Sequence, residues 1–241
     1  MQQLGPEQLH CLWQSVERKE LTEEEYALAE AKMLDAYSSV WRQALLLEGH
    51  SDLLESLLSE LSLYLGCADL AEIRRRCQGA VKAIKEAWHE KTNRITDRTA
   101  VEEFYDHNQA MLYELMWWHS LGEDTDPLGY VTALHFAQQH GCRSYLDFGA
   151  GVGAGGILFA RHRFELTLAD ISSALLGFSK WRLDSRKLEG EYIDLKAKGF
   201  PREAFDFVTA MDVFEHLFDP VGAVDDLGRA MKPGAYLFAR L

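Results

Sequence analysis

The sequence of 241 residues has few of the features that define several large protein classes. No uninterrupted apolar run reaches the roughly 18 residues of a membrane span, and the N-terminus lacks the basic-then-apolar pattern of a secretion signal. The four cysteines are Cys11, Cys67, Cys77 and Cys142, with no C-x-x-C pair. We therefore predict reduced thiols in a cytoplasmic protein, and neither disulfides nor a metal site.

Basic side chains are also scarce, with 25 Lys and Arg against 38 Asp and Glu and a formal charge of −13. The imbalance lies in residues 1–126, which hold 24 acids and 12 bases, and residues 101–126 hold seven acids and no base. Such a field repels phosphate backbones and anionic lipids, so neither nucleic acid nor a membrane is a predicted partner. Two interpretations stay open: a solvated helical surface, or a wall that attracts a cationic substrate.

No proline occurs between Pro6 and Pro127, which permits a series of long helices. Apolar residues at helical spacing, with capping boxes at Thr22-x-x-Glu25 and Thr99-x-x-Glu102, predict helices over residues 22–49, 51–66, 69–91 and 99–120. We interpret residues 1–95 as an all-α N-terminal domain that serves as a cap, substrate or dimerisation domain. Residues 96–127 are interpreted as a linking helix and lid.

After Pro127 the pattern changes to short apolar runs that alternate with helices. A helix over residues 130–140 precedes predicted strands at residues 144–148, 165–169, 192–193, 205–211 and 235–239. This alternation predicts an α/β domain over residues 128–241, a Rossmann-like doubly wound parallel sheet with helices on both faces.

The densest chemical signal is a run of glycines after the first predicted strand, in residues 149–156 (GAGVGAGG). A strand that turns sharply into a helix beside a ligand needs residues without side chains. Gly151-x-Gly153-x-x-Gly156 also fits the dinucleotide spacing, so an NAD(P)-dependent oxidoreductase is one alternative. Asp170 ends the second strand, where a carboxylate suits two ribose hydroxyls or caps the following helix.

Three motifs together resemble the small-molecule branch of the class I S-adenosylmethionine-dependent methyltransferases. Residues 146–153 (LDFGAGVG), followed by Asp170, resemble the first motif and its acidic partner. Residues 205–220 (FDFVTAMDVFEHLFDP) resemble the fourth strand and its loop, and residues 231–234 (MKPG) resemble the turn into the fifth strand. The resemblance implies S-adenosylmethionine as cofactor, a small-molecule methyl acceptor and in-line methyl transfer.

The resemblance also assigns roles to individual residues. Asp147 and the backbone of Gly149, Gly151 and Gly153 would hold the amino-acid end of the cofactor, Asp170 the ribose, Asp194 and Leu195 the adenine, and Met211 the methyl end, with Ala150 and Ile171 as further contacts. Tyr105 and Tyr113 are candidates for a lid. His216 is the candidate general base, with His119 after two tryptophans as a second; each is also explained by local packing. An aromatic wall would suit a cationic or planar acceptor.

The family fold continues beyond the fifth strand with a helix and a final strand pair, whereas this sequence ends at Leu241. We therefore expect either that the fifth strand forms a sheet edge covered by the N-terminal helices or by a second copy in a homodimer, or that the chain is truncated or unusually short. An alternative to the active enzyme is a methyltransferase-like module that binds cofactor or protein without turnover.

Overall fold

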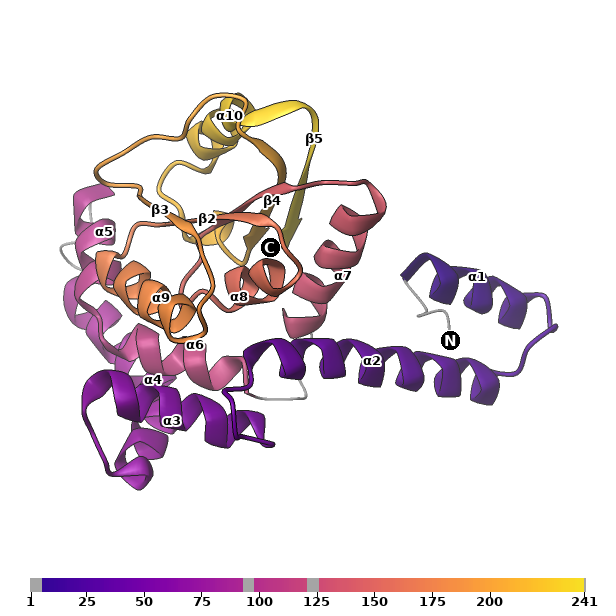
Figure 1. Ribbon diagram of the computed structural model, residues 1–241, viewed down its shortest axis with the longest axis horizontal. Helices are drawn as coiled ribbons and strands as arrows, with labels where there is room; N and C mark the ends of the chain where they lie inside the picture. Colours follow the sequence, from indigo (N-terminus) through magenta and orange to yellow (C-terminus); the bar gives the residue numbers. More distant parts are fainter. Residues whose placement is uncertain (1–5, 93–97, 121–125, 241) are drawn as a thin grey trace.

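A computed structural model describes residues 6–92, 98–120 and 126–240, and these form an α/β structure. The five strands are β1 (Ser144–Phe148), β2 (Glu165–Asp170), β3 (Glu191–Asp194), β4 (Phe205–Met211) and β5 (Met231–Arg240). They pair in the order β3-β2-β1-β4-β5, and every pairing is parallel (Figure 1). The predicted doubly wound parallel sheet is confirmed.

The first half of the chain is helical, as predicted. The helices are α1 (Pro6–Glu17), α2 (Glu23–Leu45), α3 (Leu53–Leu65), α4 (Leu70–Thr92), α5 (Arg98–His107), α6 (Ala110–Trp118), α7 (Asp126–Gln139), α8 (Ala154–Arg161), α9 (Ser173–Ser185) and α10 (Pro220–Ala230), with a 3-10 turn at Phe214–His216. The capping box at Thr22 and Glu25 is present, Asp52 caps α3, and Gly66 ends α3 in the left-handed conformation.

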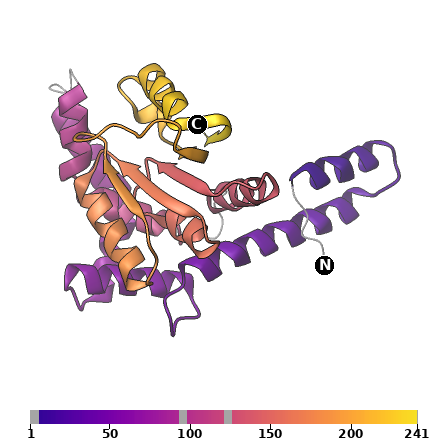
Figure 2. The same cartoon turned by 45° about the horizontal axis from the view of Figure 1, so that its top comes forward.

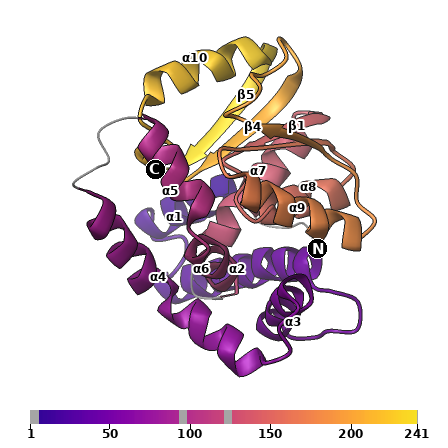
Figure 3. The ribbon, with the colours of Figure 1, turned by 90° about the vertical axis from the view of Figure 1, so that its left-hand side faces the viewer.

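One predicted helix is wrong, because residues 99–120 form two helices. The side chain of Asn108 accepts a hydrogen bond from the backbone N–H of Ala110 at 3.1 Å, and this local turn separates α5 from α6. Thr99 lies inside α5, so it does not cap that helix as predicted. The break lets α5 and α6 take different directions over the sheet edge (Figure 3).

Other element bounds also differ from the prediction. α2 ends at Leu45 and not near residue 49, α7 begins at Asp126, and α1 was not predicted. β5 begins at Met231, which pairs with Phe205 of β4. The register then shifts, so that Phe207 of β4 pairs with Tyr236 of β5. The predicted turn at residues 231–234 is thus an irregularity within the paired strand.

Helices cover both faces of the sheet, and the helical half packs on one side only. α7, α8 and α9 lie on one face, and α10 packs on the other against Leu146 and Val208 (Figure 1). α2 contacts α7 and α8, and α3 contacts α9. The N-terminal part of α2 projects with α1 beyond the body of the molecule (Figure 2). One hydrophobic cluster runs from Trp41 in α2 to Phe207 in β4.

Candidate functional site

The glycine-rich loop between β1 and α8 forms the floor of the site. Gly149, Gly151 and Gly153 have φ values of 75°, 52° and 71°, which side chains rarely adopt. The N–H groups of Gly149 and Ala150 both donate to the carbonyl of Ala169, at 2.8 and 3.1 Å. This anchors the bend to the end of β2 and leads into the N-terminus of α8, where free N–H groups favour a negative group.

Asp170 joins the second strand to this loop. It is 7% exposed, and its two carboxylate oxygens accept hydrogen bonds from the backbone N–H groups of Gly151 and Ser172, each at 2.8 Å. Burial raises the pKa of the carboxyl, although the backbone N–H donors oppose this. Capping of α9 belongs to Ser172, whose hydroxyl accepts from Leu175 N–H, and not to Asp170. A carboxylate has about four acceptor positions, so two remain for ligand hydroxyls.

Asp147 lies in β1, one residue before its end, and is completely buried. Its Oδ1 accepts hydrogen bonds from Thr209 Oγ1 at 2.9 Å and from the Tyr130 hydroxyl at 3.3 Å. Its Oδ2 has no hydrogen-bond partner among the described residues. Burial raises the pKa of Asp147 to about 6. An unpartnered buried acceptor fits an amino group.

The raised pKa of Asp147 predicts a particular pH dependence of stability. The unfolded chain loses this proton near pH 3.8, whereas the folded chain keeps it to about pH 6. The free energy of unfolding therefore falls between these values and is constant above them as far as this group is concerned. We expect Asp147→Asn to gain stability relative to the wild type from pH 4 to pH 6.5.

Urea denaturation of the two proteins without ligand at several pH values measures this difference directly. Using the difference removes the contributions of other carboxyl groups, such as Asp206, whose hydrogen bonds from Ser144 and Lys232 lower its pKa. A stability difference that stays constant across the range would contradict the assignment.

A pocket of about 320 Å³ adjoins the loop at the carboxyl ends of the strands. Its lining includes Phe148, Ile171, Leu195, Phe200, His216 and Leu217. Ile171 and Leu195 follow β2 and β3 directly, so they place apolar surface beside Asp170. A flat apolar group attached to a ribose fits this arrangement, because Asp170 and the pocket meet at one edge of the sheet.

α5 covers the outer side of this pocket. Val101 and Glu102 line it, and the Tyr105 ring lies 6.3 Å from the His216 ring. Burial, with the charges of Glu215 and Asp170, raises the pKa of the Tyr105 hydroxyl. Tyr105 thus lies on the helix that borders the pocket, beside His216.

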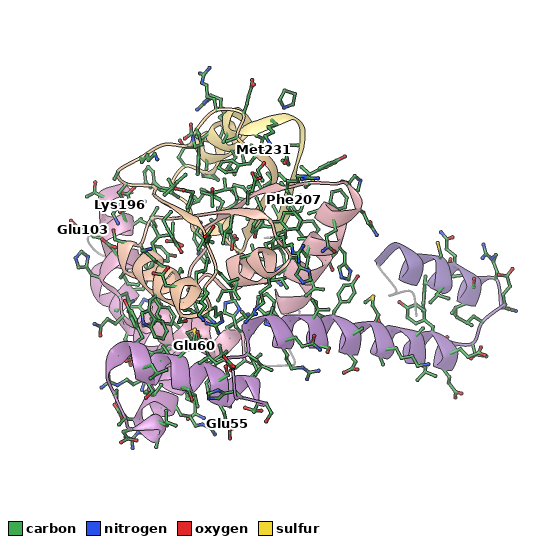
Figure 4. All side chains as sticks on the ribbon, viewed as in Figure 1. Glu55, Glu60, Glu103, Lys196, Phe207 and Met231 are labelled. Atoms are coloured by element: carbon green, nitrogen blue, oxygen red, sulfur yellow. The ribbon has the colours of Figure 1, made fainter. Side chains whose placement is uncertain are left out.

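A polar contact holds α5 against the sheet edge. Lys196 Nζ lies 3.1 Å from an Asp106 oxygen, and the other Asp106 oxygen accepts the N–H of Ser173 at 2.8 Å. Figure 4 shows Lys196 beside α5. Asp194 accepts from the Ser173 hydroxyl at 2.7 Å and from Lys196 N–H at 2.9 Å. The Asp194 carboxylate thus belongs to the same group of polar contacts that holds α5 against the sheet edge.

Three other predicted residues lie in different surroundings. Tyr113 is 6% exposed, and its hydroxyl accepts a hydrogen bond from Arg76 of α4 at 3.2 Å, so it packs between helices. Met211 ends β4 close to Gly129 of α7. His119 is half-buried against Trp41, and desolvation lowers its pKa to about 3, with Arg182 adding to the effect. A histidine in that state is neutral at physiological pH.

Several residues that support the site were not predicted. Tyr130 and Thr209 hold Asp147, and Ser179 and Arg182 bind loop carbonyls from α9. Leu115 of α6 packs against Gly151, where an added Cβ would lie 3.0 Å from Leu115 Cδ1. The signals for these contacts are long-range, because each joins residues that lie on different elements.

The methyltransferase-domain family model matches residues 146–237, which reach from β1 into β5 and include the loop, Asp170 and the pocket lining other than α5. The C-terminal half of the chain, called the methyltransferase half from here on, is therefore similar to the methyltransferase-domain family. The family resemblance seen in the motifs is confirmed. Within the methyltransferase half, the order of the strands agrees with the expected fold.

Curated relatives carry related names. The chain is 30% identical over 162 residues to a ubiquinone biosynthesis O-methyltransferase from Alkalilimnicola ehrlichii, covering 61% of this chain and 63% of the relative. A protein of the same name from Stutzerimonas stutzeri is 26% identical over 144 residues, covering 55% and 62%. The chain thus spans about three fifths of the length of these curated relatives.

Among solved structures, an S-adenosylmethionine-dependent methyltransferase from Leishmania major is 16% identical, with a TM-score of 0.49 over 65% of this chain and 68% of that one.

In the part of the chain that the structure describes, no helix combines the length and hydrophobicity needed to cross a membrane.

Proposed function

We propose that this protein transfers a methyl group from S-adenosylmethionine to a hydroxyl group of a small molecule. The observation that carries the proposal is the position of Asp170, which is bonded to the glycine loop and adjoins the apolar pocket of Ile171 and Leu195. The residues present fit the cofactor. Asp170 offers acceptors for the ribose, the pocket offers apolar surface for the adenine, and Asp147 offers an unpartnered oxygen for the amino group.

The cofactor supplies a methyl group already activated on a sulfonium, so the protein mainly orients the acceptor and excludes water. In the proposal the glycine loop and Asp147 hold one end, Ile171, Asp194 and Leu195 hold the other, and Met211 lies near the reacting centre. Tyr105 and α5 close the outer side. Tyr113 supports this cover through its packing on α4.

His216 is the proposed general base, because it follows β4 at the carboxyl edge of the sheet, where doubly wound folds bind their ligands. In that role it would accept the proton that an acceptor hydroxyl loses as its oxygen is methylated. The names of the curated relatives support a hydroxyl acceptor. A cationic or planar acceptor remains part of the proposal, because aromatic side chains such as Phe148 and Phe200 line the pocket.

The remaining parts of the proposal concern organisation. We interpret residues 1–95 as a cap over the methyltransferase half and residues 96–127 as the lid. β5 is an edge strand among the described residues, with Tyr236 39% and Leu237 37% exposed, which supports its coverage by a second copy. The four cysteines are free, which agrees with a reducing cytoplasmic location.

A ligand-dependent thermal shift tests the proposal. S-adenosylhomocysteine at about 100 times its dissociation constant should raise the melting temperature by about 5–10 °C, because it binds only the folded chain. NAD(H) should leave it unchanged. A shift with NAD(H) alone would favour the oxidoreductase. Binding of S-adenosylhomocysteine without methyl transfer to any of a panel of hydroxylated aromatic compounds would favour a module without turnover.

A further inference from the structure

A buried charged cluster joins the helical half to the methyltransferase half. Glu60 of α3 and Arg182 of α9 are both 0% exposed. The Arg182 guanidinium donates two hydrogen bonds to the Glu60 carboxylate, at 3.1 and 3.0 Å. Arg186 also donates to Glu60, and donates to the carbonyl of Leu45 at 2.6 Å. Figure 4 shows Glu60 at this junction, and Figure 3 shows α3 beside α9.

The same guanidinium reaches the glycine loop on its other side. Arg182 Nη1 donates to the carbonyl of Val152 at 2.8 Å, and the Ser179 hydroxyl donates to the carbonyl of Gly151 at 2.8 Å. In a planar trans peptide the C=O and the following N–H point in opposite directions. Holding the Gly151 carbonyl on α9 therefore turns the Val152 N–H away from α9.

Glu60 is needed to keep this arrangement in a dry environment. Two guanidinium groups share its single carboxylate, and without it each would keep only carbonyl acceptors and lack a negatively charged partner. The bidentate contact also fixes the plane of the Arg182 guanidinium, and so the direction of the N–H bond that reaches Val152. The orientation of the loop thus depends on a residue from the helical half.

We propose that Glu60 is a positioning residue that acts through Arg182 to set the glycine loop for the amino-acid end of the cofactor. The helical half is then part of the cofactor site and more than a cap. The inference rests on the proposed function, since it assumes that the loop holds that end of S-adenosylmethionine.

The test compares two ligands that differ in the relevant end. S-adenosylhomocysteine carries the amino-acid group, whereas 5′-methylthioadenosine has the same adenosine and thioether without it. We expect Glu60→Gln to weaken S-adenosylhomocysteine binding about 10- to 100-fold by calorimetry, because the loop is displaced from its working geometry. Methylthioadenosine binding should change less than about twofold, since its contacts lie elsewhere.

Two control variants separate positioning from general damage. Glu55→Gln removes an exposed carboxylate from the same helix (Figure 4). Leu57→Ala weakens the apolar packing of α3 and leaves the polar contacts between α3 and α9 in place. Both should bind the two ligands as the wild type does, even where Leu57→Ala lowers the melting temperature. Arg182→Lys keeps the positive charge but loses the hydrogen bond to Val152. It should also weaken S-adenosylhomocysteine binding more than methylthioadenosine binding, and it replaces Glu60→Gln in the test if that variant does not fold.

The outcomes are distinct. Equal weakening of both ligands in Glu60→Gln, or unchanged S-adenosylhomocysteine binding in Glu60→Gln or Arg182→Lys, would overturn the positioning role. A wild-type protein that binds neither ligand would instead refute the proposed function.

Discussion

Asp170→Asn is expected to lower the affinity for S-adenosylhomocysteine by at least about 100-fold. Both Asp170 oxygens already accept a backbone N–H, from Gly151 and Ser172. The amide of asparagine replaces one acceptor with a donor, so an NH2 group faces a backbone N–H at the position where the loop is anchored. The variant also loses the negative charge that strengthens hydrogen bonds from the two ribose hydroxyls, each worth about 1.5–3 kcal/mol.

Calorimetric titration with S-adenosylhomocysteine measures this loss. Asp184→Asn is the matched control, because Asp184 is an exposed residue of α9 that contacts only Lys180, at 3.4 Å, among the ion pairs described. It should bind with wild-type affinity. A loss of less than about threefold in Asp170→Asn would show that the ribose is held elsewhere, since one lost charged hydrogen bond already exceeds that value.

Gly149→Ala should destabilise the folded protein by about 2–5 kcal/mol. Gly149 has a φ of 75°, and an added Cβ would lie 2.4 Å from Val213 Cγ2 and 3.0 Å from its Cγ1. Backbone strain and a clash with the segment after β4 therefore act together. For a chain of this length the melting temperature should fall by about 5–15 °C.

Gly177→Ala, in the same domain, should raise the stability of the folded protein. Gly177 lies within α9, and no atom lies within 4 Å of an added Cβ. Alanine should therefore stabilise the helix by about 0.5–1 kcal/mol. Differential scanning calorimetry of both variants without ligand checks the pair. A Gly149→Ala protein as stable as the wild type would mean that the loop can move away from Val213 at no cost.

Local features of the fold could be predicted from the sequence. The capping box at Thr22 and the cap at Asp52 depend on residues three apart, and both are present. The division of residues 99–120 into two helices was missed, because apolar spacing continues across Asn108 and outweighed its turn-forming side chain. The register jump in β5 was missed because it depends on pairing with β4.

The candidate site likewise combines features that the sequence indicates locally with contacts that it does not. The glycine loop and Asp170 are readable because a turn and a strand end have local signatures. The contacts that hold them are not, since Glu60 and Arg182 are 122 residues apart and each reads as a surface charge on an amphipathic helix. Likewise, nothing near Tyr130 in the sequence indicates that its hydroxyl reaches Asp147.

Two of the polar contacts between the halves differ in their access to solvent. The Lys196 and Asp106 side chains are 25% and 23% exposed, whereas those of Glu60 and Arg182 are fully enclosed. Dissolved ions screen charges that touch water, over about 10 Å at 0.1 M salt and about 3 Å at 1 M, and reach enclosed pairs far less. Ionic strength therefore acts selectively: concentrated salt loosens α5 from the sheet edge while α3 stays attached to α9.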